Sequence, residues 1–343
     1  MIVTVPDPDR RLRRVRLVQE LWRPRLGPDF ERAGDNGAWH LHFTPPSIGR
    51  IEYQLELTDA DGRVELACDP GNPLRAPGPF GEKSVLELPG YGPPVWLAAN
   101  APAGRTRTVE VPSRTLGVDV PVTVWSPKGT RTRKPLPLLV AHDGPEYAQY
   151  SGLLRYLAAA CAAGELPPLR AALVPPVERN GDYSSSARYA RALAREILPR
   201  LEPEASTEGG AHGRAGMGTS LGALAMLHAH RTYPDAFGGL FLQSGSFFRQ
   251  RYDSHERDFP HFRRISRFVG RVLTGDSGGA PIPVAMTCGT AEENLANNRA
   301  VAAALAAQGY DVSLDLVRDA HNWVAWRDAF EPHLRAFLRR LWA

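Results

Sequence analysis

The hydrophobic positions of this chain of 343 residues follow two different patterns, which change at about residue 100. In the first part, apolar and polar residues alternate over short segments, and turn-forming sequences such as TPPS and DADG separate these segments. Alternation with a period of two is typical of strands that bury one face. Residues 1–100 are therefore predicted to form a small antiparallel β-sandwich domain. The alternating segments are Val15–Val18, Trp39–Phe43, Ile51–Leu57 and Val64–Ala67.

The stretch Pro89–Gly104 is rich in Pro and Gly, which is typical of a linker. After it, strand-like and helix-like segments alternate along the chain. The run Leu136–Ala141 is almost wholly apolar, as expected of a central strand that is buried on both faces. The alternation predicts that residues 101–343 form an α/β domain, a mostly parallel sheet with helices on both faces. The predicted strands are Val118–Trp125, Leu136–Ala141, Ala171–Val174, Pro283–Cys288 and Val312–Val317, and the predicted helices are Leu153–Ala163, Ala187–Leu201, Asn294–Gln308 and most of Trp323–Leu341.

Composition and charge narrow the class of protein. Lys and Arg number 41 against 37 Asp and Glu, and this net charge of +4 does not indicate the dense basic surface of a nucleic-acid-binding protein. The cysteines Cys68, Cys161 and Cys288 lie far apart without a C-x-x-C pair, which argues against a zinc site or a disulfide framework and favours a reducing compartment. The first residues lack the apolar core of a signal peptide, and no apolar run approaches a membrane span. We therefore expect a cytoplasmic protein with no cofactor, no metal, and no nucleic-acid or membrane partner.

The most informative chemistry lies in Gly218–Gly222, which read GTSLG and match the pattern G-x-S-x-G. The residues that follow are rich in Ala, Leu and Met up to Pro234, so a helix is predicted there. A serine at a sharp turn from a strand into a helix exposes its hydroxyl group, and the flanking glycines leave room for the tight backbone. Ser220 is therefore the candidate nucleophile.

A serine needs a base that takes its proton, and the base needs an acid that holds it in the correct tautomer. In an α/β-hydrolase the order along the chain is Ser, acid, His, each on a loop after a strand. Here the sequence GTAEEN follows the strand Pro283–Cys288 and carries Glu292, and RDAHNW follows the last predicted strand and carries His321. The sequence therefore predicts Ser220, Glu292 and His321 as a catalytic triad.

Other carboxylates remain candidates for the acid. Glu292 is preferred to Glu293 because of its distance from the end of the strand, although either could merely open the following helix, where acids are favoured in the first turn. Asp315 and Asp319 are further candidates for this role.

An acyl-transfer site also needs donors for the oxyanion that develops in the transition state. The backbone N–H of Leu221, at the start of the helix, is one candidate. The second is expected from the loop AHDGPEY, where Pro145 has no N–H, so Gly144 or Glu146 must donate, and Gly144 is preferred.

Several stretches of the chain resemble the enterochelin (enterobactin) esterase-like family of α/β-hydrolases. They are LLVAHDGPEY, VERNGDYSSSARYARALAREILPRL, RAGMGTSLGALAML, FGGLFLQSGSFF, CGTAEENLANN and AHNWVAWRDAF. The resemblance implies an α/β-hydrolase fold, a serine esterase activity, and the roles of nucleophile, base and acid for Ser220, His321 and Glu292. Asp143, Trp323 and Trp326 are candidate substrate-binding residues, although the two tryptophans could instead pack the final helix. Against the family pattern, Gly213–Met217 is a poor strand by propensity.

The first part of the chain resembles the immunoglobulin-like domains of the same esterases, through NGAWHLHFTPPSIGRIEYQLELTDADGR and CDPGNP. It is also similar to the N-terminal modules of glycogen branching enzymes. The resemblance implies an immunoglobulin-like (E-set) fold for this β-sandwich.

The resemblance implies a small ester as substrate, and the family's namesakes hydrolyse the trilactone of catecholate siderophores. Residues 249–273 carry seven arginines, which would attract an anionic ferric siderophore if they lined a cleft and would otherwise form a solvated helix face. Carbohydrate or feruloyl-type esters, acyl transfer to an alcohol, and a non-catalytic binding protein on the same fold are the alternatives. The arginines are Arg249, Arg251, Arg257, Arg263, Arg264, Arg267 and Arg271.

Overall fold

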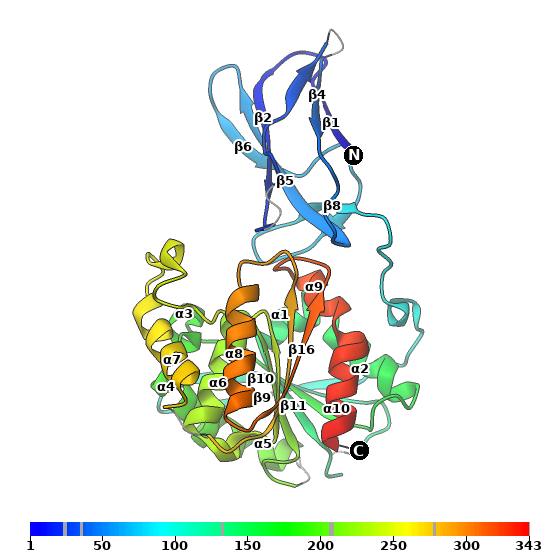
Figure 1. Cartoon of the computed structure of the whole chain (residues 1–343). Coiled ribbons are helices and arrows are strands. Elements are labelled where there is room, and N and C mark those ends of the chain that lie inside the picture. Colours follow the sequence, from blue (N-terminus) through cyan, green and yellow to red (C-terminus); the bar gives the residue numbers. More distant parts are fainter. Residues whose placement is uncertain (23–25, 35–36, 132–133, 206–208, 277–278, 343) are drawn as a thin grey trace. The chain divides into compact units, whose positions relative to one another are not determined.

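The computed structural model describes residues 1–343 except 23–25, 35–36, 132–133, 206–208, 277–278 and 343. The chain folds into two compact units (Figure 1). Unit 1 consists of Met1–Pro93 and two later segments, Gly289–Glu293 and Val317–Ala325. Unit 2 consists of Pro94–Cys288, Asn294–Leu316 and Trp326–Ala343. The boundary between domains at residue 100 stays a prediction.

Unit 1 is built around two antiparallel sheets, which confirms the predicted β-sandwich. One sheet has the strand order β1-β4-β3 and the other β2-β5-β8-β7, with β6 paired to β5. Alternate residues of these strands face inward, and Val15, Trp39 and Tyr53 are among those that form the core between the sheets. The strands are β1 Ile2–Pro6, β2 Leu12–Gln19, β3 Glu31–Ala33, β4 Ala38–His42, β5 Arg50–Asp59, β6 Val64–Ala67, β7 Arg75–Ala76 and β8 Lys83–Glu87.

Unit 2 contains one eight-stranded sheet with the strand order β16-β15-β14-β13-β11-β12-β10-β9. The pairs from β12 through β11, β13 and β14 to β15 are parallel, whereas β10 is antiparallel to both of its neighbours. All five residues of β11 are buried, as the apolar run predicts. The strands are β9 Arg105–Ser113, β10 Val118–Ser126, β11 Leu138–His142, β12 Arg170–Val174, β13 Arg214–Thr219, β14 Gly239–Gln243, β15 Pro283–Gly289 and β16 Asp311–Val317.

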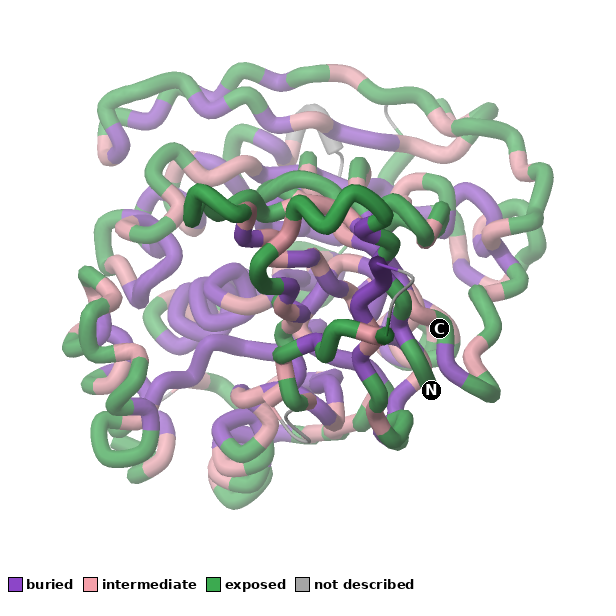
Figure 2. Tube along the Cα trace, turned by 90° about the horizontal axis from the view of Figure 1, so that it is seen from above, coloured by how far each residue is buried: buried purple, intermediate pink, exposed green. Residues whose placement is uncertain are grey.

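Helices cover both faces of this sheet, with α2 and α10 on one side and α6, α7 and α8 on the other (Figure 1). Buried residues run in continuous stretches through the interior, and exposed residues gather in the outer loops (Figure 2). No helix among the described residues is long and apolar enough to cross a bilayer. The helices are α1 Gly144–Tyr150, α2 Leu153–Ala162, α3 Arg179–Tyr183, α4 Ala187–Ala192, α5 Leu198–Ala205, α6 Leu221–Thr232, α7 Phe262–Thr274, α8 Leu295–Ala307, α9 Trp323–Asp328 and α10 Arg335–Trp342, with π-helical turns at Leu193–Ile197 and Phe330–Leu334 and 3-10 turns at Val95–Ala98, Pro234–Ala236 and Ser254–Glu256.

Strand β13 forms in the centre of the sheet although its sequence, RAGMGT, has a low strand propensity. A Cβ atom on Gly216 would lie 2.9 Å from side-chain atoms of both Leu240 and Met226. Glycine is therefore favoured by the close packing of α6 and β14 against this strand. Tertiary packing, rather than local preference, decides the conformation here.

Candidate active site

Ser220 lies at a sharp turn from β13 into α6, as the pattern GTSLG predicts. Its backbone has φ 54° and ψ −122°, a strained conformation that side chains rarely adopt. A Cβ atom on Gly218 would lie 2.5 Å from the backbone of Gly222, so the turn can close only with glycine at this position. The amide of Ser220 donates to the carbonyl of Gln243 at 2.9 Å and secures the turn to β14. This geometry is that of a nucleophile elbow.

The hydroxyl group of Ser220 lies 3.0 Å from the hydroxyl group of Ser246, on the loop that follows β14. The amide of Ser246 donates to the carbonyl of Ser220 at 3.1 Å, so side chain and backbone both join the two residues. Ser246 could not be predicted from the sequence, because only the sheet order places the end of β14 beside the end of β13.

His321 and Glu292 are brought together within unit 1, although 29 positions separate them in the chain. Nδ1 of His321 lies 2.8 Å from Oε2 of Glu292, and Oε1 of Glu292 accepts a hydrogen bond of 2.8 Å from the amide of Gly289. The carboxylate is buried, with a side chain 1% exposed, whereas the imidazole is 30% exposed. Such a pair holds Nδ1 as the donor and leaves Nε2 as the basic atom of the ring.

The surroundings of His321 shift its pKa in opposite directions. Burial alone would lower the pKa, but the charge of Glu292 and its hydrogen bond to the ring outweigh this effect. Glu20 and Glu293 add to the same electrostatic field, and the pKa of His321 is raised above its ordinary value of 6.5. The histidine is therefore tuned as a stronger base than an isolated imidazole.

The other candidate acids have different partners. Asp315 lies 3.2 Å from Nδ1 of His333, and Asp319 accepts hydrogen bonds from Ala320 and Asn322. Glu293 contributes to the field at His321 but is half-buried, and the direct hydrogen bond goes to Glu292. The geometry thus supports Glu292 as the acid.

The loop after β11 lies against the first turn of α6 within unit 2. Nδ1 of His142 lies 3.1 Å from the carbonyl oxygen of Gly222, and a Cβ atom on Gly222 would lie 3.3 Å from Oδ2 of Asp143. Gly144 and Leu221 are the first residues of α1 and α6, so neither amide takes part in the regular hydrogen bonding of its helix. The two predicted oxyanion donors therefore come from neighbouring segments, and their role stays a prediction.

Asp143 forms a bidentate ion pair with Arg179, the first residue of α3. Nε and Nη2 of the arginine donate to the two carboxylate oxygens at 2.8 and 2.7 Å, and the amide of Asp143 donates to the hydroxyl group of Tyr183 at 3.1 Å. The aspartate side chain is 1% exposed and the arginine side chain 39%. Arg179 therefore secures the loop while part of its side chain stays accessible, a role that the sequence did not predict.

The two tryptophans of the sequence AHNWVAW lie in different surroundings. Trp326 is buried, its indole N–H donates to Ser244 at 3.0 Å, and its carbonyl accepts from Gln243 at 3.1 Å. Trp323 is partly exposed. These contacts give Trp326 a packing role, and the expected contact of either tryptophan with substrate stays a prediction.

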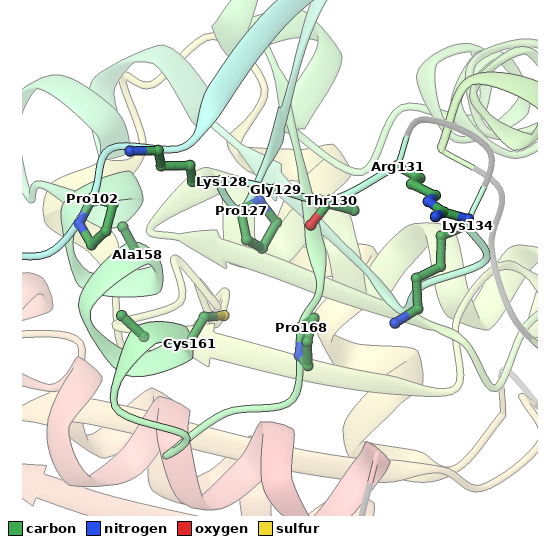
Figure 3. Close-up of a pocket in the computed structure, with 11 residues that line it drawn as sticks. Pro102, Pro127, Lys128, Gly129, Thr130, Arg131, Lys134, Ala158, Cys161 and Pro168 are labelled. Atoms are coloured by element: carbon green, nitrogen blue, oxygen red, sulfur yellow. The ribbon is translucent and has the colours of Figure 1, made fainter.

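A cavity of about 840 Å³ lies in unit 2 between the turn after β10 and the end of α2 (Figure 3). Lys128, Arg131 and Lys134 carry positive charge along it, and Cys161 and Pro168 are among its other lining residues. None of the predicted site residues is among those described as lining it. This cavity is therefore separate from the serine.

The eight-stranded sheet, the helices on both of its faces and the strained turn at Ser220 define an α/β-hydrolase fold. Residues 113–337 match the family of esterases described as "Putative esterase". The chain belongs to this family of carboxylic ester hydrolases, which confirms the resemblance found in the sequence.

Relatives and solved structures agree with this assignment. The chain is 27% identical over 206 residues to the iron(III) enterobactin esterase of Dickeya dadantii (strain 3937), a match that covers 56% of this chain and only 45% of that protein. It is 25% identical over 294 residues to the iron(III) enterobactin esterase of Escherichia coli O6:H1 (strain CFT073), covering 83% of this chain and 70% of that protein.

The fold is shared with solved structures, among them the following two. The crystal structure of the ferric enterobactin esterase from Salmonella typhimurium superposes with a TM-score of 0.81 at 20% identity and covers 99% of this chain and 93% of that one. A ferulic acid esterase superposes with a TM-score of 0.58 at 19% identity and covers 69% of this chain and 98% of that one.

Proposed function

We propose that this chain is a serine esterase that cleaves a carboxylic ester through an acyl-enzyme on Ser220. The observation that carries the proposal is the hydrogen bond of 2.8 Å between Glu292 and Nδ1 of His321, which prepares Nε2 as a base. Ser220, Glu292 and His321 follow β13, β15 and β16, which belong to one sheet. This chain order and topology support a Ser-His-Glu triad.

In the proposed reaction, Oγ of Ser220 attacks the carbonyl carbon of the ester while Nε2 of His321 takes the hydroxyl proton. The N–H groups of Leu221 and Gly144 stabilise the negative oxygen of the tetrahedral intermediate. His321 then donates its proton to the leaving alcohol, and the acyl group stays on Ser220. His321 then takes a proton from water as the water oxygen attacks the carbonyl carbon of the acyl-enzyme. It returns this proton to Oγ of Ser220 as the acid leaves, which restores the serine hydroxyl group.

For the substrate, we propose the ester bonds of an anionic catecholate siderophore, with release of its iron in the cytoplasm. The names of the relatives from Dickeya and Escherichia support this class. The exposed arginines Arg263, Arg267 and Arg271 follow one another at intervals of four on α7 and would attract an anionic ligand, although this spacing also fits a solvated helix face.

A feruloyl-type or carbohydrate ester is the second candidate, supported by the fold shared with a ferulic acid esterase. The two candidates differ in charge, because the ferric tris-catecholate is strongly anionic. Hydrolysis of the anionic siderophore should therefore depend more strongly on the positive charge of α7 and on ionic strength than hydrolysis of the feruloyl or carbohydrate ester.

The test compares hydrolysis of a short-chain p-nitrophenyl ester, a feruloyl ester and a catecholate trilactone, iron-free and iron-loaded, by the wild type and Ser220→Ala. Cleavage of the trilactone that depends on Ser220, with slow turnover of the other esters, is the expected result. Activity on the simple or feruloyl ester alone would keep the triad and overturn the substrate. Equal rates for the wild type and Ser220→Ala would overturn the esterase itself.

A further inference from the structure

Arg50, the first residue of β5, and Gly49 before it both contact the segment of unit 1 that carries His321. The amide of Gly49 donates to the carbonyl of Arg318 at 2.6 Å. Nη1 of Arg50 lies 3.4 Å from Oδ2 of Asp319 and 3.3 Å from Oδ1 of Asn322. These contacts span about 270 positions of the chain, so the fold rather than the local sequence creates them.

Arg50 is an unusual residue for this place, because its side chain is only 3% exposed. A buried guanidinium group is costly unless its N–H groups are paired. Nη2 pairs with Glu52 at 3.1 Å on the same strand, while Nη1 reaches Asp319 and Asn322. The fork of the arginine thus joins β5 to the residues on both sides of His321.

The two residues that Arg50 contacts, Asp319 and Asn322, also form hydrogen bonds with the backbone around His321. Oδ1 of Asp319 accepts from the amide of Ala320 at 2.7 Å and from Nδ2 of Asn322 at 2.9 Å. Oδ1 of Asn322 also accepts from the amide of Ala325, in the first turn of α9, at 2.8 Å. His321 therefore lies inside a closed hydrogen-bonded turn whose two polar side chains both contact Arg50.

The segment that carries Glu292 is held in a similar way. The amide of Trp22 donates to the carbonyl of Ala291 at 2.8 Å. Ala291 and Ala320 pack in one small buried cluster with Leu21, Ile48, Ile51 and Leu88. Both members of the acid–histidine pair are thus next to residues anchored in the core of unit 1.

We propose that Arg50 is a positioning residue that holds the turn 319–322 so that the imidazole of His321 faces Glu292 in its productive orientation. The effect on catalysis rests on the proposed function, in which His321 is the base. Arg50 acts through Asp319 and Asn322 and takes no part in proton transfer. A displacement of about 1 Å at a catalytic group costs on the order of 10²-fold in rate, so loss of these contacts should lower kcat far more than it changes KM.

The test uses Arg50→Met, which keeps an unbranched apolar stem but removes the guanidinium group, and Arg50→Lys, which keeps the charge. Tyr53→Phe is the matched control, because the hydroxyl group of this buried residue of β5 donates to Asp69 at 2.6 Å, apart from the turn. For each full-length variant we would measure kcat and KM for p-nitrophenyl acetate, the melting temperature, and the low-field proton resonance of the His321 Nδ1–H. The absence of that resonance in His321→Asn assigns it.

Arg50→Met should lower kcat by about 10- to 100-fold with KM changed less than about twofold, and should broaden or shift the Nδ1–H resonance. Arg50→Lys should retain the fold and show a smaller loss of the same kind. Tyr53→Phe should lower the melting temperature and leave kcat and the resonance unchanged.

Two results would overturn the proposal: an unchanged kcat and resonance in both Arg50 variants, or equal losses in Tyr53→Phe at the same loss of stability. The resonance separates this inference from the proposed function, because it reports the Glu292–His321 contact even if the wild type hydrolyses no ester. A broadened or shifted resonance in Arg50→Met but not in Tyr53→Phe would support the positioning role in that case as well.

Discussion

Glu292 accepts the hydrogen bond of His321 Nδ1 at 2.8 Å. The second oxygen of the same carboxylate accepts from the backbone amide of Gly289, also at 2.8 Å, at the end of β15. The carboxylate is thus oriented by the backbone on one side and by the imidazole on the other. This arrangement distinguishes Glu292 from its neighbour Glu293 and leads to a test of each residue.

Glu292→Gln should lower kcat by about 10²- to 10³-fold, less than Ser220→Ala or His321→Ala, because the acid orients and stabilises the histidine without exchanging a proton itself. Glu293→Gln is the matched control and should stay within about threefold of the wild type, because its charge acts on His321 without that hydrogen bond. Steady-state kinetics on p-nitrophenyl acetate measure both. An unchanged kcat in Glu292→Gln together with a large loss of kcat in Glu293→Gln would reverse the assignment of the acid.

The raised pKa of His321 predicts the pH dependence of activity. Only the neutral imidazole acts as a base, so kcat/KM should fall as the pH drops through a value above the ordinary pKa of 6.5. Glu292→Gln should move this acid limb to lower pH, because the charge that raises the pKa is lost and burial, which lowers it, remains. Glu20→Gln should move it in the same direction by less.

The raised pKa of His321 also determines how the stability of the folded protein changes with pH. Since the pKa of the folded state lies above that of the unfolded state, the pair stabilises the fold fully below the unfolded pKa. This contribution is lost as the pH rises through the folded pKa. Unfolding in denaturant at several pH values, for the wild type and Glu292→Gln, should show it, and a stabilisation by the pair that grows with pH would contradict the account.

The sequence predicted much of the fold because several signals were local. The apolar run of β11 and the pattern GTSLG each depend on residues close together in the chain, and the order Ser, Glu, His is itself a property of the sequence. The strand β13 was less clear, because its glycines reflect the close packing of α6 and not a preference for strand. Segment Val95–Ala98, expected within a linker, forms a 3-10 turn instead, because the ring of Trp96 packs against Tyr156 at 5.2 Å.

The residues that hold the candidate site in place could not be predicted from the sequence, because their partners lie far away in the chain. Ser246, Arg179 and Arg50 reach their partners across 26, 36 and about 270 positions, so no spacing rule connects them. From the sequence alone, an arginine in a strand is expected on the surface, whereas Arg50 is buried because its partners pair with it.

Gly218 provides a test of the elbow. Gly218→Ala should destabilise the fold by about 2–3 kcal/mol and abolish most activity, because its Cβ would meet the backbone of Gly222, which cannot yield as a flexible side chain can. Gly270→Ala is the matched control, since Gly270 lies within α7 with no atom within 4 Å of its Cβ position. That change should stabilise by about 0.5–1 kcal/mol and leave activity unchanged. Chemical denaturation compares the two, and similar effects would contradict the close approach.

Asp143 and Arg179 provide a test of the loop beside the elbow. Arg179→Met leaves the buried carboxylate of Asp143 without its bidentate partner and should destabilise the fold by about 1–3 kcal/mol. The double variant Asp143→Asn/Arg179→Met should recover part of this loss, because it removes the unpaired charge. A double-mutant cycle in urea measures the coupling, and strictly additive effects would show that the pair does not stabilise the loop.

In the proposed esterase, Ser220 is the nucleophile and His321 activates it. The most direct measurement is the rate and site of labelling by a fluorophosphonate, followed by mass spectrometry of the intact protein and its peptides. We predict one adduct per chain, on the peptide that contains Ser220, and labelling slower by about 10³-fold or more in His321→Ala. An adduct on another residue, or equal labelling rates in the wild type and His321→Ala, would contradict the role of Ser220 as a nucleophile activated by His321.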